Sequence, residues 1–190
     1  MNNEKEYSVE LRVWHWLNAI AVLGLLGTVI LRKTFLSWRD NSLLIIEKFS
    51  SFDIVVTAEQ AKLVAKAIRA PMWEWHIIFG LALAVLIVYR LIMIARRGTQ
   101  FPKNPSSHMK IVYMGYIVLY AILTSMAVSG LVMYFHEALG ISKDFAHSIK
   151  ELHEYAMWSV ALFVPMHIVG VFKAENDDQK GIVSKMISGN

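Results

Sequence analysis

Four histidines lie inside or at the edges of long apolar stretches of the sequence, where a side chain that can bind a metal is unusual. The chain has seven histidines in 190 residues, and these four are His15, His76, His153 and His167. Ionisable side chains within membrane-embedded segments are costly and mark functional sites by default. Neutral imidazole is a common axial ligand of haem iron, and facing helices can supply such ligands in pairs. For a single histidine, a hydrogen bond to a neighbouring helix is an equal alternative, but four together favour haem.

The absence of cysteine limits the chemistry that these histidines can support. Disulfides, thiolate zinc sites, iron–sulfur clusters and a covalently attached c-type haem all need cysteine. The zinc-hydrolase pattern H-E-x-x-H is also missing, because neither His136-Glu137 nor His153-Glu154 is followed by a second histidine at the required spacing. Any haem is therefore expected to be bound without covalent attachment.

The apolar residues form four blocks, each long enough to cross a membrane. A hydrocarbon core of roughly 30 Å needs about 20 apolar residues in a helix. Hydrophobic residues make up 56% of the chain, above the roughly 45–50% of a soluble domain. The sequence predicts an all-α membrane protein with one domain over residues 1–190, a four-transmembrane-helix bundle. The spans are predicted at residues 11–32, 72–95, 110–135 and 152–173.

The positions of the four histidines along these spans predict two depths in the membrane. An even number of spans puts both termini on one side, so His15, early in the first span, and His167, late in the fourth, share one depth. His76 and His153 share the opposite depth. The fourteen positions between His153 and His167 fall about 40° short of four helical turns and rise about 21 Å. One helix is therefore predicted to offer one imidazole to each of two stacked haems.

The charges that flank the spans predict the orientation of the chain. The net charge is +4, and the loop at residues 96–110 carries basic residues and no acidic ones. The loop between the third and fourth spans mixes both signs. The positive-inside rule therefore places the 96–110 loop and both termini in the cytoplasm. Because the basic residues flank apolar blocks, they fit lipid headgroups rather than nucleic acid.

The connection between the first two spans, Arg32–Pro71, contains signals of helical structure that an unstructured linker would lack. Thr57 and Gln60 have the spacing of a helix capping box. Apolar residues then recur at helical spacing, at Ala61, Val64, Ala65 and Ile68. An amphipathic helix ended by Pro71 is predicted here, lying on the outer membrane face or against a partner. A surface helix that covers the bundle is an equal alternative.

Three further side chains are candidates for contacts with a quinone or with haem propionates: Arg12, Arg90 and His108. Both arginines can pair with carboxylates, although snorkelling of their side chains to the membrane interface explains them equally well. A solvated loop histidine is the default interpretation for His108, as it is for His136 and His147.

Small residues lie near these histidines: Gly80 follows His76 by one turn, Gly170 follows His167 by three residues, and Gly24 and Gly27 lie on the first span. They leave room for a bulky macrocycle beside the imidazoles. Close packing of membrane helices through small residues explains them equally well.

At these residues the chain resembles a known family. The stretches that carry the resemblance are Arg12-Val-Trp-His15-Trp-Leu-Asn-Ala19, Glu74-Trp-His76 with Gly80, and His153 with His167-Ile-Val-Gly170. They resemble the bacterial di-haem cytochrome b561 group, which includes the b-type cytochrome subunits of Ni/Fe hydrogenases. The gamma subunits of membrane formate dehydrogenases are similar. The resemblance covers about residues 8–173, and the histidine spacing on the last span is its most specific part.

The resemblance implies two non-covalent haem b groups. His15 and His167 would hold the cytoplasmic-side iron, and His76 and His153 the outer one. A quinone site near one haem and a location in the bacterial inner membrane follow from the same resemblance. The long first connection is closer to subunits that dock a periplasmic or membrane-associated redox partner than to stand-alone members. A homodimer is left open.

The predicted function is transmembrane electron transfer through two b-type haems, between a membrane quinone pool and a redox partner protein. Such a chain would be an electron-transfer subunit of an oxidoreductase, and the sequence leaves open whether it is an enzyme by itself. One alternative is a stand-alone quinone oxidoreductase that accepts electrons from a small donor such as superoxide. A haem-free anchor or transporter is the other.

Overall fold

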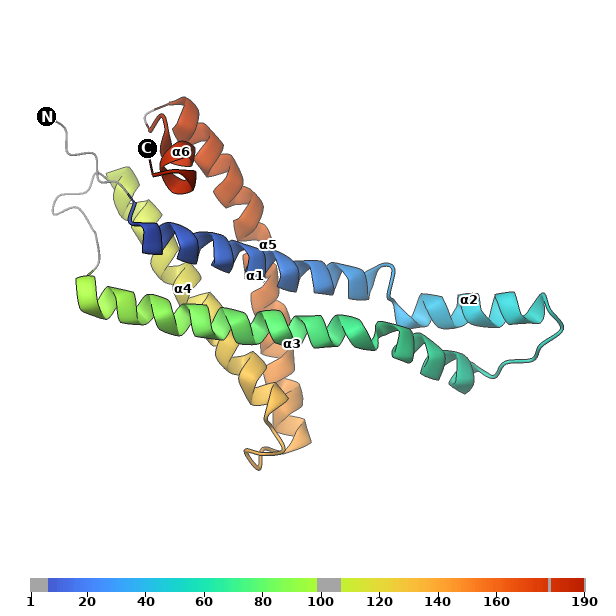
Figure 1. Ribbon diagram of the computed structural model, residues 1–190. Helices are drawn as coiled ribbons and strands as arrows, with labels where there is room; N and C mark the ends of the chain where they lie inside the picture. Colours follow the sequence, from blue (N-terminus) through green and yellow to red (C-terminus); the bar gives the residue numbers. More distant parts are fainter. Residues whose placement is uncertain (1–6, 99–106, 178, 190) are drawn as a thin grey trace, which may run out of the picture. The chain divides into compact units, whose positions relative to one another are not determined.

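The computed structural model describes residues 7–98, 107–177 and 179–189, most of which are helical. Six helices follow one another along the described chain (Figure 1): α1 (Val9–Lys33), α2 (Trp38–Ser50), α3 (Ala58–Arg97), α4 (Ser107–Tyr134), α5 (Lys143–Asn176) and α6 (Ile182–Ile187). No strand occurs in these described ranges. The predicted all-α fold is confirmed.

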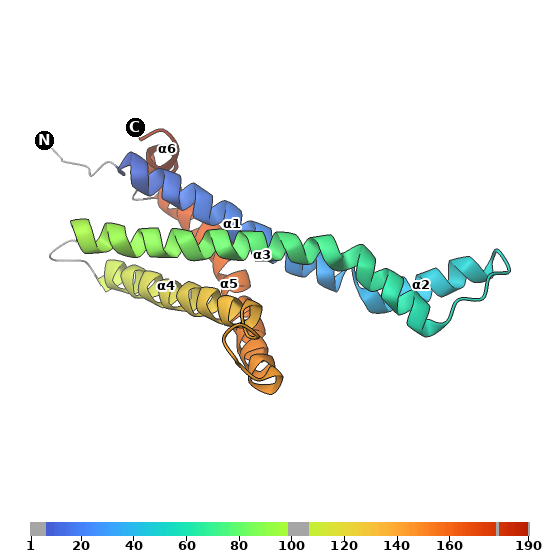
Figure 2. The same cartoon turned by 60° about the horizontal axis from the view of Figure 1, so that its bottom comes forward.

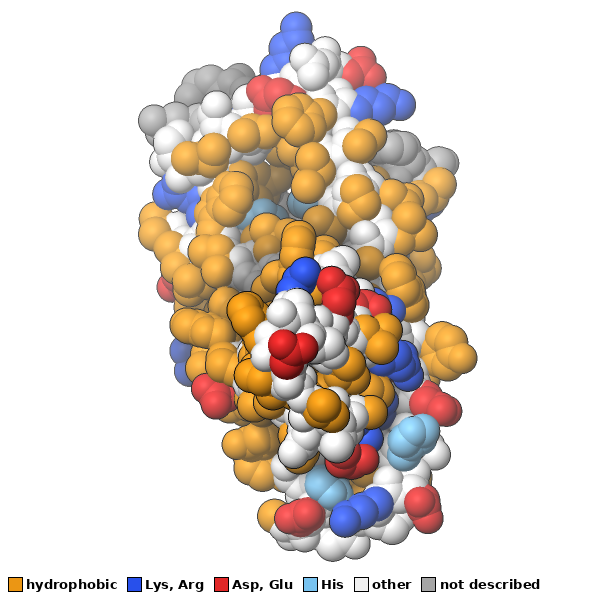
Figure 3. Space-filling model, turned by 90° about the vertical axis from the view of Figure 1, so that its right-hand side faces the viewer, with side chains coloured by type: hydrophobic (Ala, Val, Ile, Leu, Met, Phe, Trp, Pro, Cys, Tyr) orange, Lys and Arg blue, Asp and Glu red, His pale blue; other side chains and the backbone are white. Residues whose placement is uncertain are grey.

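Four of the helices, α1, α3, α4 and α5, are long and apolar enough to cross a membrane. Between 6% and 22% of the residues in their most apolar stretches are buried within the chain. Many of their apolar side chains are therefore exposed, and Figure 3 shows hydrophobic side chains over much of the face that it draws. Lipid solvates such a surface, and helices satisfy their backbone hydrogen bonds internally. The chain is a multi-pass membrane protein, as the sequence predicts.

The chain divides into two compact units. One unit consists of residues 20–82, and the other combines residues 1–19 with residues 83–190. Helices α1 and α3 contribute residues to both units. The single domain over residues 1–190 stays a prediction.

In the unit of residues 20–82, the second half of α1 packs closely against α3. A Cβ atom added at Gly24 would lie 2.7 Å from the ring of Phe79. About two turns further along α1, the guanidinium carbon of Arg32 lies 5.5 Å from the ring centre of Trp73. Small residues at such contacts let two helix backbones approach closely, which is how many membrane helices pack.

The first turns of α3 run back alongside α2, so that the two segments form a helical hairpin (Figures 1 and 2). The ammonium groups of Lys62 and Lys66 lie 5.7 and 6.0 Å from the ring centre of Trp38. On the same segment of α3, Ala61 and Ala65 are fully buried. Cation–π contacts and small buried residues therefore hold this hairpin together.

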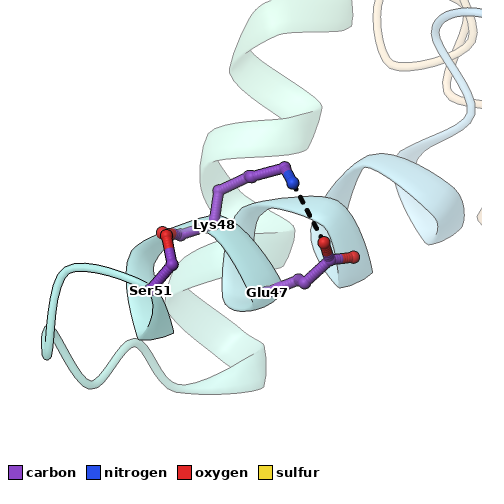
Figure 4. A network of polar contacts seen from close by, with 3 residues as sticks. All are labelled: Glu47, Lys48 and Ser51. Carbon is purple, nitrogen blue, oxygen red and sulfur yellow. Dashed lines mark hydrogen bonds and ion pairs between the residues drawn. The ribbon is translucent and has the colours of Figure 1, made fainter.

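A local set of polar contacts marks the end of α2 (Figure 4). Lys48 pairs with Glu47 at 3.0 Å, and the Ser51 hydroxyl donates to the Lys48 carbonyl at 2.6 Å. The ion pair is largely exposed, so it contributes little to stability. The Ser51 contact satisfies one of the last helix carbonyls, which have no partner inside the helix. Asp53 then reverses the chain with a φ of 58°.

The predicted capping box is present, but Pro71 does not end the helix. The Thr57 N–H donates to Gln60 Oε1 at 2.9 Å, and the Gln60 N–H donates to Thr57 Oγ1 at 3.2 Å. Helix α3 then runs from Ala58 to Arg97 with Pro71 inside it. The prediction of a separate surface helix was therefore wrong, because this segment and the second span form one helix. Proline removes one intrahelical hydrogen bond and bends a helix without necessarily ending it.

Two features of the described helices were not predicted. Helix α2 was not recognised as a separate element within the first connection. Helix α5 begins at Lys143, well before the predicted start of the fourth span at residue 152. Its N-terminus is capped by Ser142, whose hydroxyl accepts the Phe145 N–H at 3.3 Å. This cap starts the helix in a polar stretch that hydropathy alone assigns to a loop.

In the other unit, α4 and α5 pack against each other and are joined by the short turn at residues 135–142. The start of α1 is tied to the last part of α3 by Trp14, whose indole N–H donates to the Leu86 carbonyl at 2.8 Å. Helix α6 lies against the start of α1, where Trp16 Nε1 donates to the Met186 carbonyl at 3.2 Å. The unit thus brings both ends of the chain's described part together.

Candidate functional site

His15 of α1 and His167 of α5 come together within one unit. Their ring centroids lie 6.1 Å apart, and the ring planes are inclined by 55°. A metal held by one nitrogen of each ring needs two bonds of about 2 Å, and each ring centre lies about 1 Å beyond its nitrogen, so about 6 Å separates the centroids of an axial pair. The observed spacing fits two axial ligands of one iron.

Aromatic side chains from the same helices surround this pair. Phe163, one turn before His167, stacks on its ring with centroids 5.6 Å apart and planes inclined by 14°. Trp16 meets the ring of His15 edge-on at 5.4 Å. Such contacts restrict the rotation of both imidazoles and provide an apolar environment, which is how a protein tunes a bound haem.

His76 lies on α3 in the unit of residues 20–82. Its Nδ1 atom is 2.7 Å from the hydroxyl oxygen of Thr28 on α1. Trp73, three residues earlier, meets the His76 ring edge-on at 5.7 Å. The Nδ1 side of the imidazole thus faces the Thr28 hydroxyl.

His153 lies on α5, in the same unit as His15 and His167. Its Nδ1 atom is 2.8 Å from the hydroxyl oxygen of Ser129 on α4. Gly130, the next residue of α4, lies so close that an added Cβ would be 3.6 Å from the His153 ring. His76 and His153 belong to different units, and their pairing on one iron stays a prediction.

The two candidate arginines are engaged in different ways. Arg12 donates through Nη1 to the Ile187 carbonyl of α6 at 3.2 Å, while its Nε is buried without a hydrogen-bond partner. The guanidinium of Arg90 lies over the ring of Trp14 at 5.1 Å and donates through Nε to the Tyr120 hydroxyl at 3.3 Å. Arg90 is therefore a partly desolvated cation held next to the residue that precedes His15.

The three remaining histidines contribute nothing to these pairs in the described structure. His108 is in the first turn of α4, but its side chain lies outside the described residues. His147 is exposed and lies 3.8 Å from Glu151, one turn along its own helix. His136 is half-buried, and its Nδ1 lies 3.0 Å from the Met133 carbonyl. His136 is thus less solvated than its loop position predicts.

Sequence reasoning missed three groups of residues in these sites. The hydroxyls of Thr28 and Ser129, the phenol of Tyr120 and helix α6 all contact predicted site residues. A signal existed for the two hydroxyls, since polar side chains inside an apolar span need a partner. No pattern in the sequence indicated which side chain that partner would be.

The residues present fit haem by their donor chemistry and by the space around them. Added Cβ atoms at Gly80 and Gly170, close to His76 and His167, would meet no atom within 4 Å. Among the described residues, no three His, Asp or Glu side chains converge on a metal-sized site. The described structure thus brings one pair of imidazoles together, that of His15 and His167. The buried Nε of Arg12 adds a donor that a propionate can use.

A comparison with protein families decides between a haem protein and the haem-free anchor or transporter. The model of the family described as prokaryotic cytochrome b561 matches residues 6–189. The chain belongs to the prokaryotic cytochrome b561 family. As a cytochrome b561, it binds b-type haem and transfers electrons across the membrane. No similarity to a curated protein or to a solved structure was found. The predicted family is confirmed.

Proposed function

We propose that this cytochrome b561 carries electrons through two b-type haems, between a membrane quinone and a redox partner protein. His15 and His167 hold the cytoplasmic-side iron, and His76 and His153 hold the outer one. The observation that carries the proposal is the pair formed by His15 and His167, whose centroid spacing of 6.1 Å suits two axial ligands. Because two separate helices supply this pair, its spacing is a property of the fold rather than of one helical turn.

Helix α5 supports the assignment of a second haem. It is continuous from Lys143 to Asn176 in spite of Pro165, so His153 and His167 lie on one helix. Their separation of about 21 Å along the axis leaves room for two macrocycles at different depths. Each histidine has a neighbour from another helix of its own unit, His15 for His167 and Ser129 for His153.

The chain's own residues bind, orient and enclose the cofactor. Bound haem supplies reversible one-electron chemistry at its iron. The imidazoles would bind the iron through a ring nitrogen, and the aromatic rings of Trp16 and Phe163 limit their rotation. Arg90, held over Trp14, provides a positive charge for a propionate or for the carbonyl of a quinone. The apolar helix surfaces keep water away from the irons.

We place the quinone at a groove between the start of α1 and α6. The groove has a volume of about 360 Å³ and is lined by Val9, Arg12, Val13, Trp16, Leu17 and Ile187. Apolar walls with a single charged side chain, that of Arg12, suit a hydrophobic ring that carries carbonyl oxygens, since ligand sites combine apolar lining with few polar groups. Trp16 also contacts the His15 ring, so a quinone in this groove would lie close to the proposed cytoplasmic-side haem.

We place both termini in the cytoplasm of a bacterial inner membrane, which puts the α2–α3 hairpin on the outer side. The hairpin is where we expect the redox partner to bind. Its tip exposes large apolar side chains, with Phe52 73% and Val55 91% exposed. Purification from native membranes tests this part, since a stoichiometric partner should be retained by the natural chain and lost from a Phe52→Ser/Val55→Ser variant. Equal recovery from both would contradict it.

The ligand assignment is tested by counting haems per polypeptide. Pyridine haemochrome analysis should find two haems in the natural protein and one in His167→Leu. His147→Leu, an exposed histidine on the same helix, is the matched control and should keep two. Two haems in His167→Leu, or one in the natural protein, would overturn the proposal.

A further inference from the structure

The hydroxyl of Thr28 makes two contacts of hydrogen-bond length. Its oxygen lies 2.6 Å from the carbonyl oxygen of Leu25, one turn earlier on α1, and 2.7 Å from His76 Nδ1. A carbonyl oxygen can only accept, and a hydroxyl has one proton. The Thr28 proton is therefore used on Leu25, and His76 must bring the proton for the second contact. Thr28 is 5% exposed, so water does not replace either contact.

Ser129 repeats this arrangement on another pair of helices. Its oxygen lies 3.0 Å from the Met126 carbonyl, again one turn earlier, and 2.8 Å from His153 Nδ1. The same count of protons makes His153 Nδ1–H the donor and the Ser129 oxygen the acceptor. Two histidines on two different helices thus share one hydrogen-bonding pattern.

Both bonds select the same imidazole tautomer. In a neutral imidazole only one nitrogen carries a proton, so with the proton on Nδ1 it is Nε2 that carries the lone pair a metal can bind. The bond also sets the angle of the ring about its side-chain axis. Metal-bound histidines usually donate their second nitrogen in this way, which orients the ring and makes the metal-bound nitrogen a stronger donor.

We infer that Thr28 and Ser129 are positioning residues for the two ligands of the outer haem, each accepting the Nδ1–H of one imidazole. This inference rests on the ligand set proposed above, His76 and His153. A ligand nitrogen that donates more electron density to the iron favours the ferric over the ferrous state. The two hydroxyls therefore lower the reduction potential of the outer haem. Losing either bond raises that potential and leaves the other haem unchanged.

Potentiometric titration of the purified, haem-loaded protein tests the inference. Thr28→Val and Ser129→Ala each remove one hydroxyl with little change of volume. Thr28→Ser and Ser129→Thr keep it. Thr34→Val and Ser125→Ala are matched controls, because these hydroxyls also donate to a backbone carbonyl one turn earlier and are exposed. The electron paramagnetic resonance spectrum of each variant gives a second readout, the geometry of the oxidised iron.

A lost hydrogen bond of ordinary strength shifts an equilibrium about two- to tenfold, which is about 18 to 59 mV for one electron. Thr28→Val and Ser129→Ala should each raise the potential of the same haem by that amount and alter its low-spin signal. The hydroxyl-keeping variants and the controls should match the natural protein. Shifts no larger than those of the controls, or shifts of two different haems, would overturn the inference.

A separate variant distinguishes failure of the inference from failure of the ligand set. His76→Leu should lose one haem while the other keeps its potential. If it does, and the hydroxyl variants show no shift, the positioning role alone is wrong. If His76→Leu keeps both haems, the proposed ligand set is wrong, and the inference falls with it.

Discussion

Replacing Gly24 by alanine tests how closely α1 and α3 must approach in the unit of residues 20–82. The added Cβ would lie 2.7 Å from the Phe79 ring, whereas ordinary contacts begin at 3.4 Å, so the ring or the helix must move by about 0.7 Å, the difference between the two. Thr28, one turn beyond Gly24, lies 2.7 Å from His76 Nδ1. The same displacement there gives about 3.4 Å, which is too long for a good hydrogen bond.

The energetic effect is the balance of two terms. Overpacking of this kind typically lowers the free energy of unfolding by about 1–3 kcal/mol. Replacing glycine by alanine in a helix raises it by about 1 kcal/mol. We expect Gly24→Ala to be destabilised by up to about 2 kcal/mol. The assay is the thermal loss of the reduced haem absorption band in detergent, together with the potential of the proposed outer haem, which should rise.

Two further variants make this prediction sharp. Gly115→Ala is the control, because an added Cβ there meets no atom within 4 Å and only the helix-propensity gain remains. Gly24→Ala combined with Phe79→Leu should recover much of the lost stability, since contacting residues are not additive. If Gly24→Ala alone were as stable as Gly115→Ala and had unchanged haem potentials, the close approach of the two helices would be refuted.

Three other changes have expected outcomes. Thr57→Ala removes half of the capping box and should destabilise the first turns of α3 by about 1 kcal/mol, seen as faster amide exchange there; unchanged exchange would contradict it. Glu175→Gln should loosen α6 and speed limited proteolysis near the C-terminus, because this carboxylate accepts the backbone N–H groups of Gly181 and Val183 at 2.9 and 3.0 Å. Arg90→Gln should lower the potential of the haem on His15, since a nearby cation favours the reduced iron. An unchanged potential would mean that the Arg90 charge does not act on this haem.

Apolar block length and local capping signals predicted the spans and one helix start well. The four predicted blocks fall on α1, α3, α4 and α5, apart from residue 135, which follows the end of α4 at Tyr134. A run of about 20 apolar residues has few alternatives to a membrane helix. The capping box at Thr57 and Gln60 was predictable because both partners lie within one turn. Such features depend on neighbours in the sequence, which a single chain displays directly.

The features that were not predicted depend on packing between distant segments. Pro71 was taken as a helix end, but proline costs one hydrogen bond and a bend, and a long helix can absorb both. The contact of Thr28 with His76 joins residues 48 positions apart. Its geometry follows from how α1 approaches α3, which depends on Gly24 and Phe79. Hydropathy treats a threonine in a span as a minor polar residue and does not identify its partner.

The central claim is that His15 and His167 share one iron, and replacing one axial ligand tests it most directly. In a potentiometric titration of His15→Met, one of two one-electron components should move to higher potential, because exchanging one histidine ligand for methionine raises the potential of a haem. The other component should stay where it is in the natural protein. If neither component moved, or if both moved together, His15 would not be a ligand of a single, separate haem.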